Sequence, residues 1–209
     1  MADDATTWSL IHAGRTSLAS TVAELTPEQW RTPSLCAGWT VGALAAHLLA
    51  SAEQTPGRFL AGMVTSGFRF GALMERDIAA RAALTPEQVA DRLLLRTTTT
   101  NKPPAPAVAM LGEVVVHSED LRRPLGLPGR VDKDAADLCL DMYSRANVPV
   151  GGKRRIAGLR LVSTDTAWSC GDGPDVTGPA TSLLLAMTGR SAGLSDLTGE
   201  GVPALRARL

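Results

Sequence analysis

One stretch, residues 111–126 (LGEVVVHSEDLRRPLG), constrains the fold of this chain more than any other. It lies in an apolar run that includes residues 114–116 (VVV), as expected of a buried helix. Glu113 and His117 stand four residues apart in this run, and at helical pitch such side chains share one face, with Cβ atoms roughly 5–6 Å apart. Burying a carboxylate and an imidazole without partners is costly. We therefore expect a divalent cation between them.

Few other side chains are available to complete such a site, because the chain has only three histidines. His47 lies in ALAAHLLA, within a helix predicted over residues 41–63. In helical bundles, metal sites are built from inward-facing side chains on facing helices. His47, Glu113 and His117 form a two-histidine, one-carboxylate set that suits zinc with open coordination positions, and nickel or iron as well. We expect the third histidine, His12, at the surface.

The same residues allow a plainer interpretation. A histidine on an apolar helix face is commonly a core histidine with its hydrogen bonds satisfied, and an E-x-x-x-H pair also arises by chance on helix surfaces. Two features favour the metal site. Both helical histidines fall in strongly apolar segments, and Glu113 occupies a position where the pattern calls for valine or leucine.

The pattern of apolar residues predicts a mainly α protein in two parts. Helical periodicity indicates four main helices, over residues 6–25, 41–63, 85–96 and the stretch that contains 111–122. A break rich in threonine and proline, residues 97–106, precedes the last of these, and a further helix is expected over 131–146. From residue 159 the pattern alternates and includes a Gly-Asp-Gly-Pro turn. We predict a four-helix bundle over residues 1–147, followed by a small α/β domain over 148–209.

Charge and composition argue against several classes of function. Twenty-one basic residues balance twenty-one acidic ones, and no basic stripe or polybasic helix indicates nucleic acid or a membrane surface as a partner. No apolar run approaches the length of a membrane span, and the acidic N-terminus lacks the apolar region of a secretory signal. Three widely spaced cysteines suggest no disulfide framework, so a cytoplasmic protein is the expectation.

The cysteines are not expected to act as nucleophiles. Cys36, Cys139 and Cys170 form no CxxC pair, and none is expected beside a histidine. Cys36 stands apart from the other two because its loop leads into the helix that carries His47. Its plainer interpretation, a small buried residue, is preferred.

Three segments together resemble one family. Residues 35–54 (LCAGWTVGALAAHLLASAEQ) resemble the signature loop and helix of the mycothiol-dependent maleylpyruvate isomerase N-terminal family, which belongs to the DinB-like metal-binding four-helix bundles. Residues 111–126 resemble the second motif of that family, and residues 158–190 resemble the C-terminal appendage of many members. The resemblance implies a DinB-like bundle with a small α/β appendage, in agreement with the periodicity.

The resemblance also implies roles for particular residues. The metal ligands of the family fall on His47, Glu113 and His117, the set already selected by spacing. The implied cofactor is mycothiol, the low-molecular-weight thiol of actinobacteria. A catalytic arginine of the family's C-terminal domain matches Arg190, which has capping of the preceding helix as its alternative role.

Four other residues near these motifs have structural interpretations. We expect Arg122 and Arg123 to be solvated or in salt bridges. Trp39 and Thr40 are expected to anchor the loop and to cap the helix that follows it.

The reaction type implied is attack by a metal-activated thiolate on an electrophilic carbon. An isomerase returns the thiol after rotation and elimination, whereas an S-transferase releases the adduct. The expected partners are a small-molecule thiol and an electrophilic substrate, with a homodimer kept as an option. Two other classes stay open. One is a non-catalytic protein whose metal stabilises the bundle and whose C-terminal domain binds a partner or lipid, and the other is a hydrolase with a metal-activated water.

Overall fold

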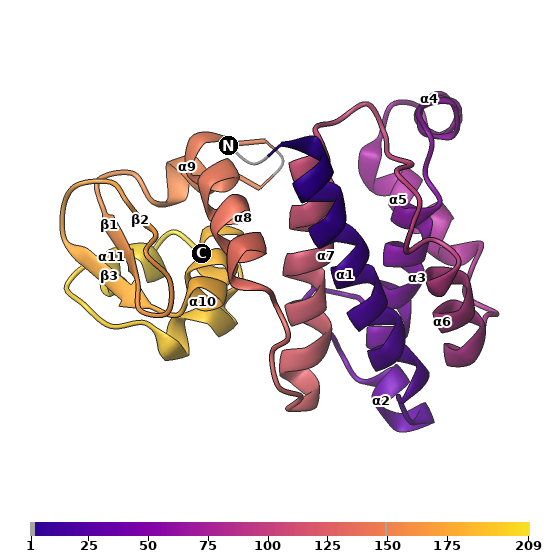
Figure 1. Ribbon diagram of the computed structural model, residues 1–209, viewed down its shortest axis with the longest axis horizontal. Coiled ribbons are helices and arrows are strands. Elements are labelled where there is room, and N and C mark those ends of the chain that lie inside the picture. The colour runs from indigo at the N-terminus through magenta and orange to yellow at the C-terminus, as the bar shows by residue number, and fades with distance from the viewer. Residues whose placement is uncertain (1–2, 149) are drawn as a thin grey trace. The chain divides into compact units, whose positions relative to one another are not determined.

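The computed structural model describes residues 3–148 and 150–209, and it confirms a mainly α fold with a small C-terminal α/β part (Figure 1). Packing divides the described chain into two compact units, one of residues 3–130 and one that begins at residue 131. The domains expected over 1–147 and 148–209 include residues 1, 2 and 149. These three lie outside the described residues.

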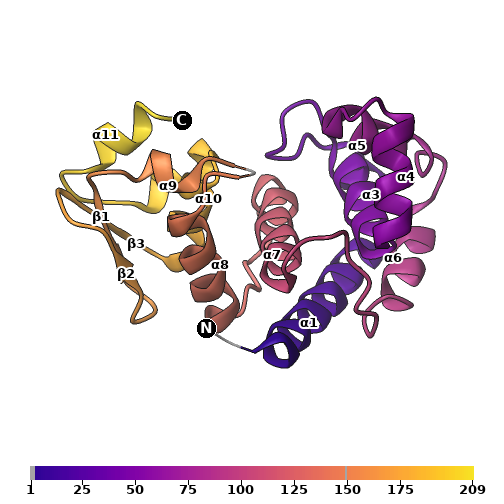
Figure 2. The ribbon, with the colours of Figure 1, turned by 90° about the horizontal axis from the view of Figure 1, so that it is seen from above.

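The first unit consists of helices and their connections, with one isolated β-bridge between Pro33 and Thr40. Its elements are α1 (Asp4–Ala23), α2 (Pro27–Arg31), α3 (Val41–Ala52), α4 (Pro56–Thr65), α5 (Phe70–Ala79), α6 (Pro86–Leu94), α7 (Ala107–Arg122) and the 3₁₀ turn η1 (Arg123–Leu125). Helix α1 packs against α6 and α7, and α3 packs against α5, α6 and α7, so that α1, α3, α6 and α7 form the bundle. Helices α4 and α5 lie beside α3 (Figure 2).

The helix predicted over residues 41–63 is in fact two helices. Helix α3 ends at Ala52, and α4 begins at Pro56 after Thr55, which is extended and accepts a hydrogen bond from the Arg58 N–H at 3.2 Å. Proline has no N–H to donate and disfavours helical backbone in the residue before it, so a continuous helix breaks here. Thr-Pro-Glu sequences at residues 26 and 85 begin α2 and α6, and both carry a capping box.

A leucine- and alanine-rich core fills the space between the bundle helices. Its fully buried members come from α1, α3, α6 and α7, and include Leu18, Val22, Leu44, Leu49, Val89, Leu93 and Leu121. Burying a side chain of this size contributes roughly 1.5–3 kcal/mol each. This core fixes the positions of α3 and α7, the two helices that carry the candidate metal ligands.

The second unit combines helices with a three-stranded sheet. Its elements are α8 (Lys133–Arg145), α9 (Gly152–Arg155), β1 (Arg160–Ser163), β2 (Ser169–Cys170), β3 (Asp175–Gly178), α10 (Ala180–Met187), η2 (Ser191–Asp196) and α11 (Val202–Arg206). The strand order is β2-β1-β3, with β1 antiparallel to β2 and parallel to β3. Leu161 of β1 stands opposite Cys170 on β2 and Val176 on β3.

Helix α8 belongs to this second unit by packing. Its buried residues include Ala136, Cys139 and Leu140, and it packs against α10 and α9. The division between the units therefore falls between Arg130 and Val131, whereas we expected it near residue 147. A helical pattern does not reveal which neighbour covers its apolar face, which is why periodicity assigned α8 to the bundle.

Asp165 ties the sheet of this unit to α10. Its Oδ1 accepts hydrogen bonds from the Ala180 N–H at 2.8 Å and from the Ser163 hydroxyl at 3.0 Å. The bond from Ala180 lowers the pKa of Asp165, with Ser163 and Lys133 acting in the same direction and burial acting against them. The carboxylate thus serves as a cap for a helix that begins 15 residues later in the chain.

We expect Asp165→Ala to lower the free energy of unfolding of this unit by about 1 kcal/mol, as for loss of a helix cap. Because folding lowers the pKa of this carboxyl, its contribution is present above about pH 4 and is lost as pH falls through the lowered value. Urea denaturation of wild type and variant at pH 7 and pH 3 measures both effects. Asp172→Ala, in an exposed turn, is the control, and an equal loss in the two variants would contradict the capping role.

Candidate metal centre

Two bundle helices bring the predicted ligands together. Helix α3 carries His47, which is 7% exposed, and α7 carries Glu113 and His117. Helix α3 begins where Thr40 accepts a hydrogen bond from the Ala43 N–H at 3.1 Å, so Thr40 is the cap we expected. The start of α3 and its packing against α7 place the imidazole of His47 opposite the polar pair on α7.

The three side chains converge on one small volume. The Nε2 atom of His47 lies 2.5 Å from Oε1 of Glu113, and Nε2 of His117 lies 3.9 Å from the same oxygen. One ligand atom from each residue lies within 4.8 Å of the other two. The two imidazole rings are 5.3 Å apart between centroids and meet edge to face.

This arrangement fits a divalent cation. Two imidazole nitrogens and a carboxylate are a donor set that zinc, nickel and iron accept. The distance of 3.9 Å between Nε2 of His117 and Oε1 of Glu113 is too long for a hydrogen bond. Nε2 of His47 lies within hydrogen-bond distance of the same oxygen, and a cation held by the three groups would replace that contact. The Glu113 side chain is 29% exposed, so water reaches the cluster on its side.

Asp120 holds the outer nitrogen of His117. Its Oδ2 lies 2.8 Å from Nδ1 of His117, and its side chain is fully buried. A carboxylate in this place selects the tautomer in which Nδ1–H donates, which leaves the lone pair of Nε2 directed at the cluster. Sequence reasoning missed Asp120 as a site residue. Its signal was the acidic residue one turn after the histidine in residues 117–120 (HSED).

Cys36 also contacts this pair, contrary to our expectation. Its Sγ donates to Oδ2 of Asp120 at 3.2 Å and lies 3.5 Å from Nδ1 of His117. The loop reaches α7 because the Leu35 N–H donates to the Asp120 carbonyl at 3.1 Å. The prediction that no cysteine lies beside a histidine is therefore wrong for Cys36, since it considered only neighbours along the chain.

Cys36, His117 and Asp120 form a second set whose ligand atoms lie within 4.8 Å of one another. An ion on this set would need the Nδ1 atom of His117, which already bonds Asp120 at 2.8 Å. One nitrogen cannot both donate to the carboxylate and coordinate a metal. The geometry therefore favours the set of His47, Glu113 and His117 as the ligands, with Asp120 behind it.

Two other predicted residues have hydrogen-bond partners of their own. His12 is half-buried rather than at the surface. Its Nε2 lies 3.2 Å from the Thr99 carbonyl. Arg190 belongs to the second unit, where it donates to the Thr188 carbonyl at 2.9 Å, at the end of α10. That bond is the capping contact we gave as its alternative role.

Structural roles were also expected for Trp39, Arg122 and Arg123. The Trp39 ring lies against that of His47, with 5.1 Å between centroids. Arg123 pairs with Glu119 at 3.1 Å, which confirms the expected salt bridge. Arg122 is only 3% exposed, so the expectation of a solvated side chain is wrong for it.

We expect Asp120→Asn to weaken metal binding about 10–100-fold, the usual effect of losing a carboxylate behind a metal-bound histidine. An amide can present its NH₂ to Nδ1 and so favour the wrong tautomer of His117. Competition with a chromogenic chelator measures the dissociation constant, and the midpoint of thermal unfolding without metal separates this effect from stability. Asp91→Asn, exposed on α6, is the control. Equal metal affinity in Asp120→Asn and wild type would contradict the positioning role.

Fold and site define a helical-bundle protein with a partly buried His–Glu–His cluster and an α/β appendage. Residues 11–102 match the family model described as the mycothiol maleylpyruvate isomerase N-terminal domain. Over this segment the match confirms the resemblance to that family. The matched segment includes His47 and ends before α7, so the assignment of Glu113 and His117 rests on geometry.

Two solved structures with a similar fold are structures of a maleylpyruvate isomerase. A crystal structure of the mycothiol-dependent maleylpyruvate isomerase is 16% identical, with a TM-score of 0.63 over 95% of this chain and 93% of that chain. A histidine-to-alanine mutant of that enzyme gives a TM-score of 0.59 over the same shares. At this identity the likeness establishes the fold. Among proteins with curated functions, none is similar enough in sequence to be matched. Within the described residues, no helix has both the length and the apolar character needed to span a membrane.

Proposed function

We propose that this protein is a metal-dependent enzyme of the mycothiol-dependent maleylpyruvate isomerase type. The observation that carries the proposal is the convergence of His47, Glu113 and His117 from two helices to within 4.8 Å. The match of residues 11–102 to the isomerase N-terminal domain supports the choice of thiol and substrate class. Transfer of the thiol to an electrophile, giving a stable adduct, is the related activity that the same site would support.

The three ligands would hold zinc, with nickel or iron as the other cations that suit them. When bound, the cation supplies a Lewis-acidic position at which a thiol is stabilised as its thiolate, the nucleophile that isomerisation of a conjugated double bond needs. Glu113 contributes a negative charge to the site, and the two histidines bind as neutral imidazoles. Asp120 fixes the ring of His117 through Nδ1, and the Trp39 ring limits the rotation of His47.

Arg190 is proposed to bind the carboxylate of the substrate. A guanidinium forms two parallel hydrogen bonds to a carboxylate, and it stabilises the enolate charge that grows when a nucleophile adds to a conjugated acid. We expect Arg190→Ala to lower kcat/KM about 100-fold, with partial recovery in Arg190→Lys, as for loss of one charge-stabilising donor. Steady-state kinetics with Arg154→Ala as the exposed control measures this effect. Normal kinetics combined with lower stability would show that Arg190 caps α10 and does not bind the substrate.

The experiment that tests the function uses the purified full-length protein with its metal. Metal content is measured after expression in medium that supplies zinc, nickel and iron. Isomerisation of maleylpyruvate is then followed with and without mycothiol. We expect about one metal per chain, from a single three-ligand site, and conversion that requires both the metal and the thiol.

Three results would oppose this proposal. A metal-free wild-type protein would remove its basis, and turnover of the substrate by hydrolysis without thiol would indicate a metal-activated water instead. Bound metal with neither conversion nor heat on titration with mycothiol would indicate a structural ion.

A further inference from the structure

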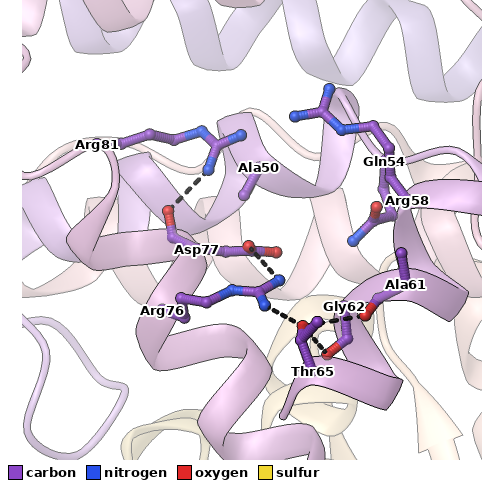
Figure 3. A pocket seen from close by; sticks show the side chains of 9 residues that line it. All are labelled: Ala50, Gln54, Arg58, Ala61, Gly62, Thr65, Arg76, Asp77 and Arg81. Atoms are coloured by element: carbon purple, nitrogen blue, oxygen red, sulfur yellow. Dashed lines mark hydrogen bonds and ion pairs between the residues drawn. The ribbon is translucent and has the colours of Figure 1, made fainter.

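A pocket lies beside α3, between α4 and α5, and has a volume of about 330 Å³ (Figure 3). It contains none of the three side chains proposed to bind the metal. Its apolar wall consists of Ala50, Ala61 and Gly62. Pockets that bind small molecules have volumes of roughly 300–1,000 Å³, so this one is large enough for a small metabolite.

Three arginines line this pocket from opposite sides. Arg76 and Arg81 reach in from α5 and the turn after it, while Arg58 of α4 lies across the pocket together with Gln54 (Figure 3). Guanidinium groups repel one another, so their convergence favours a site that holds negative charge. Arginine also recognises carboxylate and phosphate groups through paired hydrogen bonds.

Two of these guanidinium groups are held in place by the protein. Arg81 pairs with Glu53 at 2.6 Å and donates to the Asp77 carbonyl at 2.7 Å, and its side chain is only 10% exposed. Arg76 donates to the Thr65 hydroxyl and pairs with the Asp77 carboxylate at 3.6 Å. Side chains fixed in this way lose little conformational entropy when a ligand binds.

Gly62 allows Arg76 to approach α4 closely. A Cβ atom at this position would lie 3.0 Å from Nη2 of Arg76 and 2.6 Å from Cδ1 of Leu73. A side chain here would therefore displace the guanidinium and fill part of the pocket. The glycine keeps the pocket open at the point where its apolar wall meets the charged one.

The pocket has an excess of positive charge and unused donors. Three guanidinium groups face two carboxylates, Glu53 and Asp77, which leaves one positive charge in excess. Arg58 makes one long hydrogen bond, 3.4 Å from Nη1 to the Glu53 carbonyl. These features suit a ligand with one anionic group.

We propose that this pocket binds a small organic anion whose carboxylate or phosphate group contacts the arginines and whose short carbon body lies against Ala50, Ala61 and Gly62. Arg58 and Arg76 would contact the anionic group directly, and Arg81 would supply long-range attraction. The site is separate from the metal centre, and the proposal does not depend on the function proposed above.

Titration calorimetry of the metal-loaded protein tests this site with two probes, succinate for the carboxylate and glucose 6-phosphate for the phosphate. Sodium chloride keeps the ionic strength equal, because exposed charges are screened by salt. We expect at least one probe to bind. Arg58→Ala and Arg76→Ala should each weaken binding about tenfold, the effect of losing a hydrogen bond to a charged group. The control, Arg92→Ala, removes an exposed arginine of α6 and should bind as wild type does.

The pattern across variants decides the outcome. Binding by only one probe identifies the anionic group, and binding by both still supports the site. The absence of heat with both probes would overturn the proposal, as would equal affinity in Arg58→Ala and wild type. Arg58 is the decisive position because, among the described residues, its side chain makes only the one long hydrogen bond, so its loss should leave the fold intact. Binding that disappears in Glu113→Ala would place the anion at the metal centre instead.

Discussion

A His117→Ala variant is expected to lose its divalent cation and, with it, the mycothiol-dependent activity, while the helical bundle stays folded. Removing one of three protein ligands should weaken metal binding by more than about 100-fold, because loss of a partner behind a ligand already costs about 10–100-fold. The bundle should remain folded, since its apolar core lies among α1, α3, α6 and α7 and does not include His117. Emission spectrometry after dialysis measures the metal, and circular dichroism measures helical content.

The chain supplies its own control for this variant. His12 is also a half-buried histidine in the first unit, but it contacts the Thr99 carbonyl and is distant in sequence from the three ligands. His12→Ala should keep the full metal content. Glu113→Gln should lose the metal as well, because it removes the negative charge of the site at nearly constant shape. Full metal content in both His117→Ala and Glu113→Gln would show that the ion binds elsewhere and that the three side chains are a polar cluster without a metal.

The cluster was predictable because helical periodicity carries most of the information it requires. Polar side chains at positions 47, 113 and 117 interrupt apolar helix faces, and such faces turn inward when a bundle forms. The structure brings the three together as expected. The break of the predicted 41–63 helix at Pro56 also had a signal in the sequence, a Thr-Pro pair like those at which α2 and α6 begin.

The contacts of the loop before α3 were not predictable from spacing. Cys36 and Asp120 are 84 residues apart, and they meet because the loop packs on α7 through the Leu35–Asp120 hydrogen bond. Periodicity describes one element at a time and gives no information on such contacts. The same limit explains α8, whose apolar face packs against α10.

The environment of Arg122 shows a further limit of the sequence. Its position near the end of α7, beside Arg123, indicated a solvated or ion-paired cation. In the structure its Nη2 donates to the Ser17 carbonyl and hydroxyl, each at 3.2 Å, and to the Thr21 hydroxyl. Burial lowers the pKa of the Arg122 guanidinium, and the nearby Arg130 adds to this effect, whereas Glu119 and Glu24 oppose it. The hydrogen bonds that the guanidinium donates to α1 compensate the cost of burying this charge.

We therefore expect Arg122→Ala to be strongly destabilising, by about 3 kcal/mol, because it leaves a cavity and unpaired oxygens on α1. For a chain of this size, that loss lowers the midpoint of thermal unfolding by about 10 °C. Arg122→Lys should recover only part of the stability, since an ammonium cannot reproduce the contacts of the planar guanidinium to Ser17 and Thr21.

Arg130→Ala is the matched control, because Arg130 is exposed and its charge acts unfavourably on Arg122. We expect stability equal to wild type or slightly higher in this variant, and calorimetry of the three variants at one pH and ionic strength measures the differences. If Arg122→Ala unfolds at the wild-type temperature, α1 and α7 are held together by apolar packing alone. The hydrogen bonds of the guanidinium would then only offset the free-energy cost of burying its charge. Such a balance is known for buried charges that apolar side chains can replace.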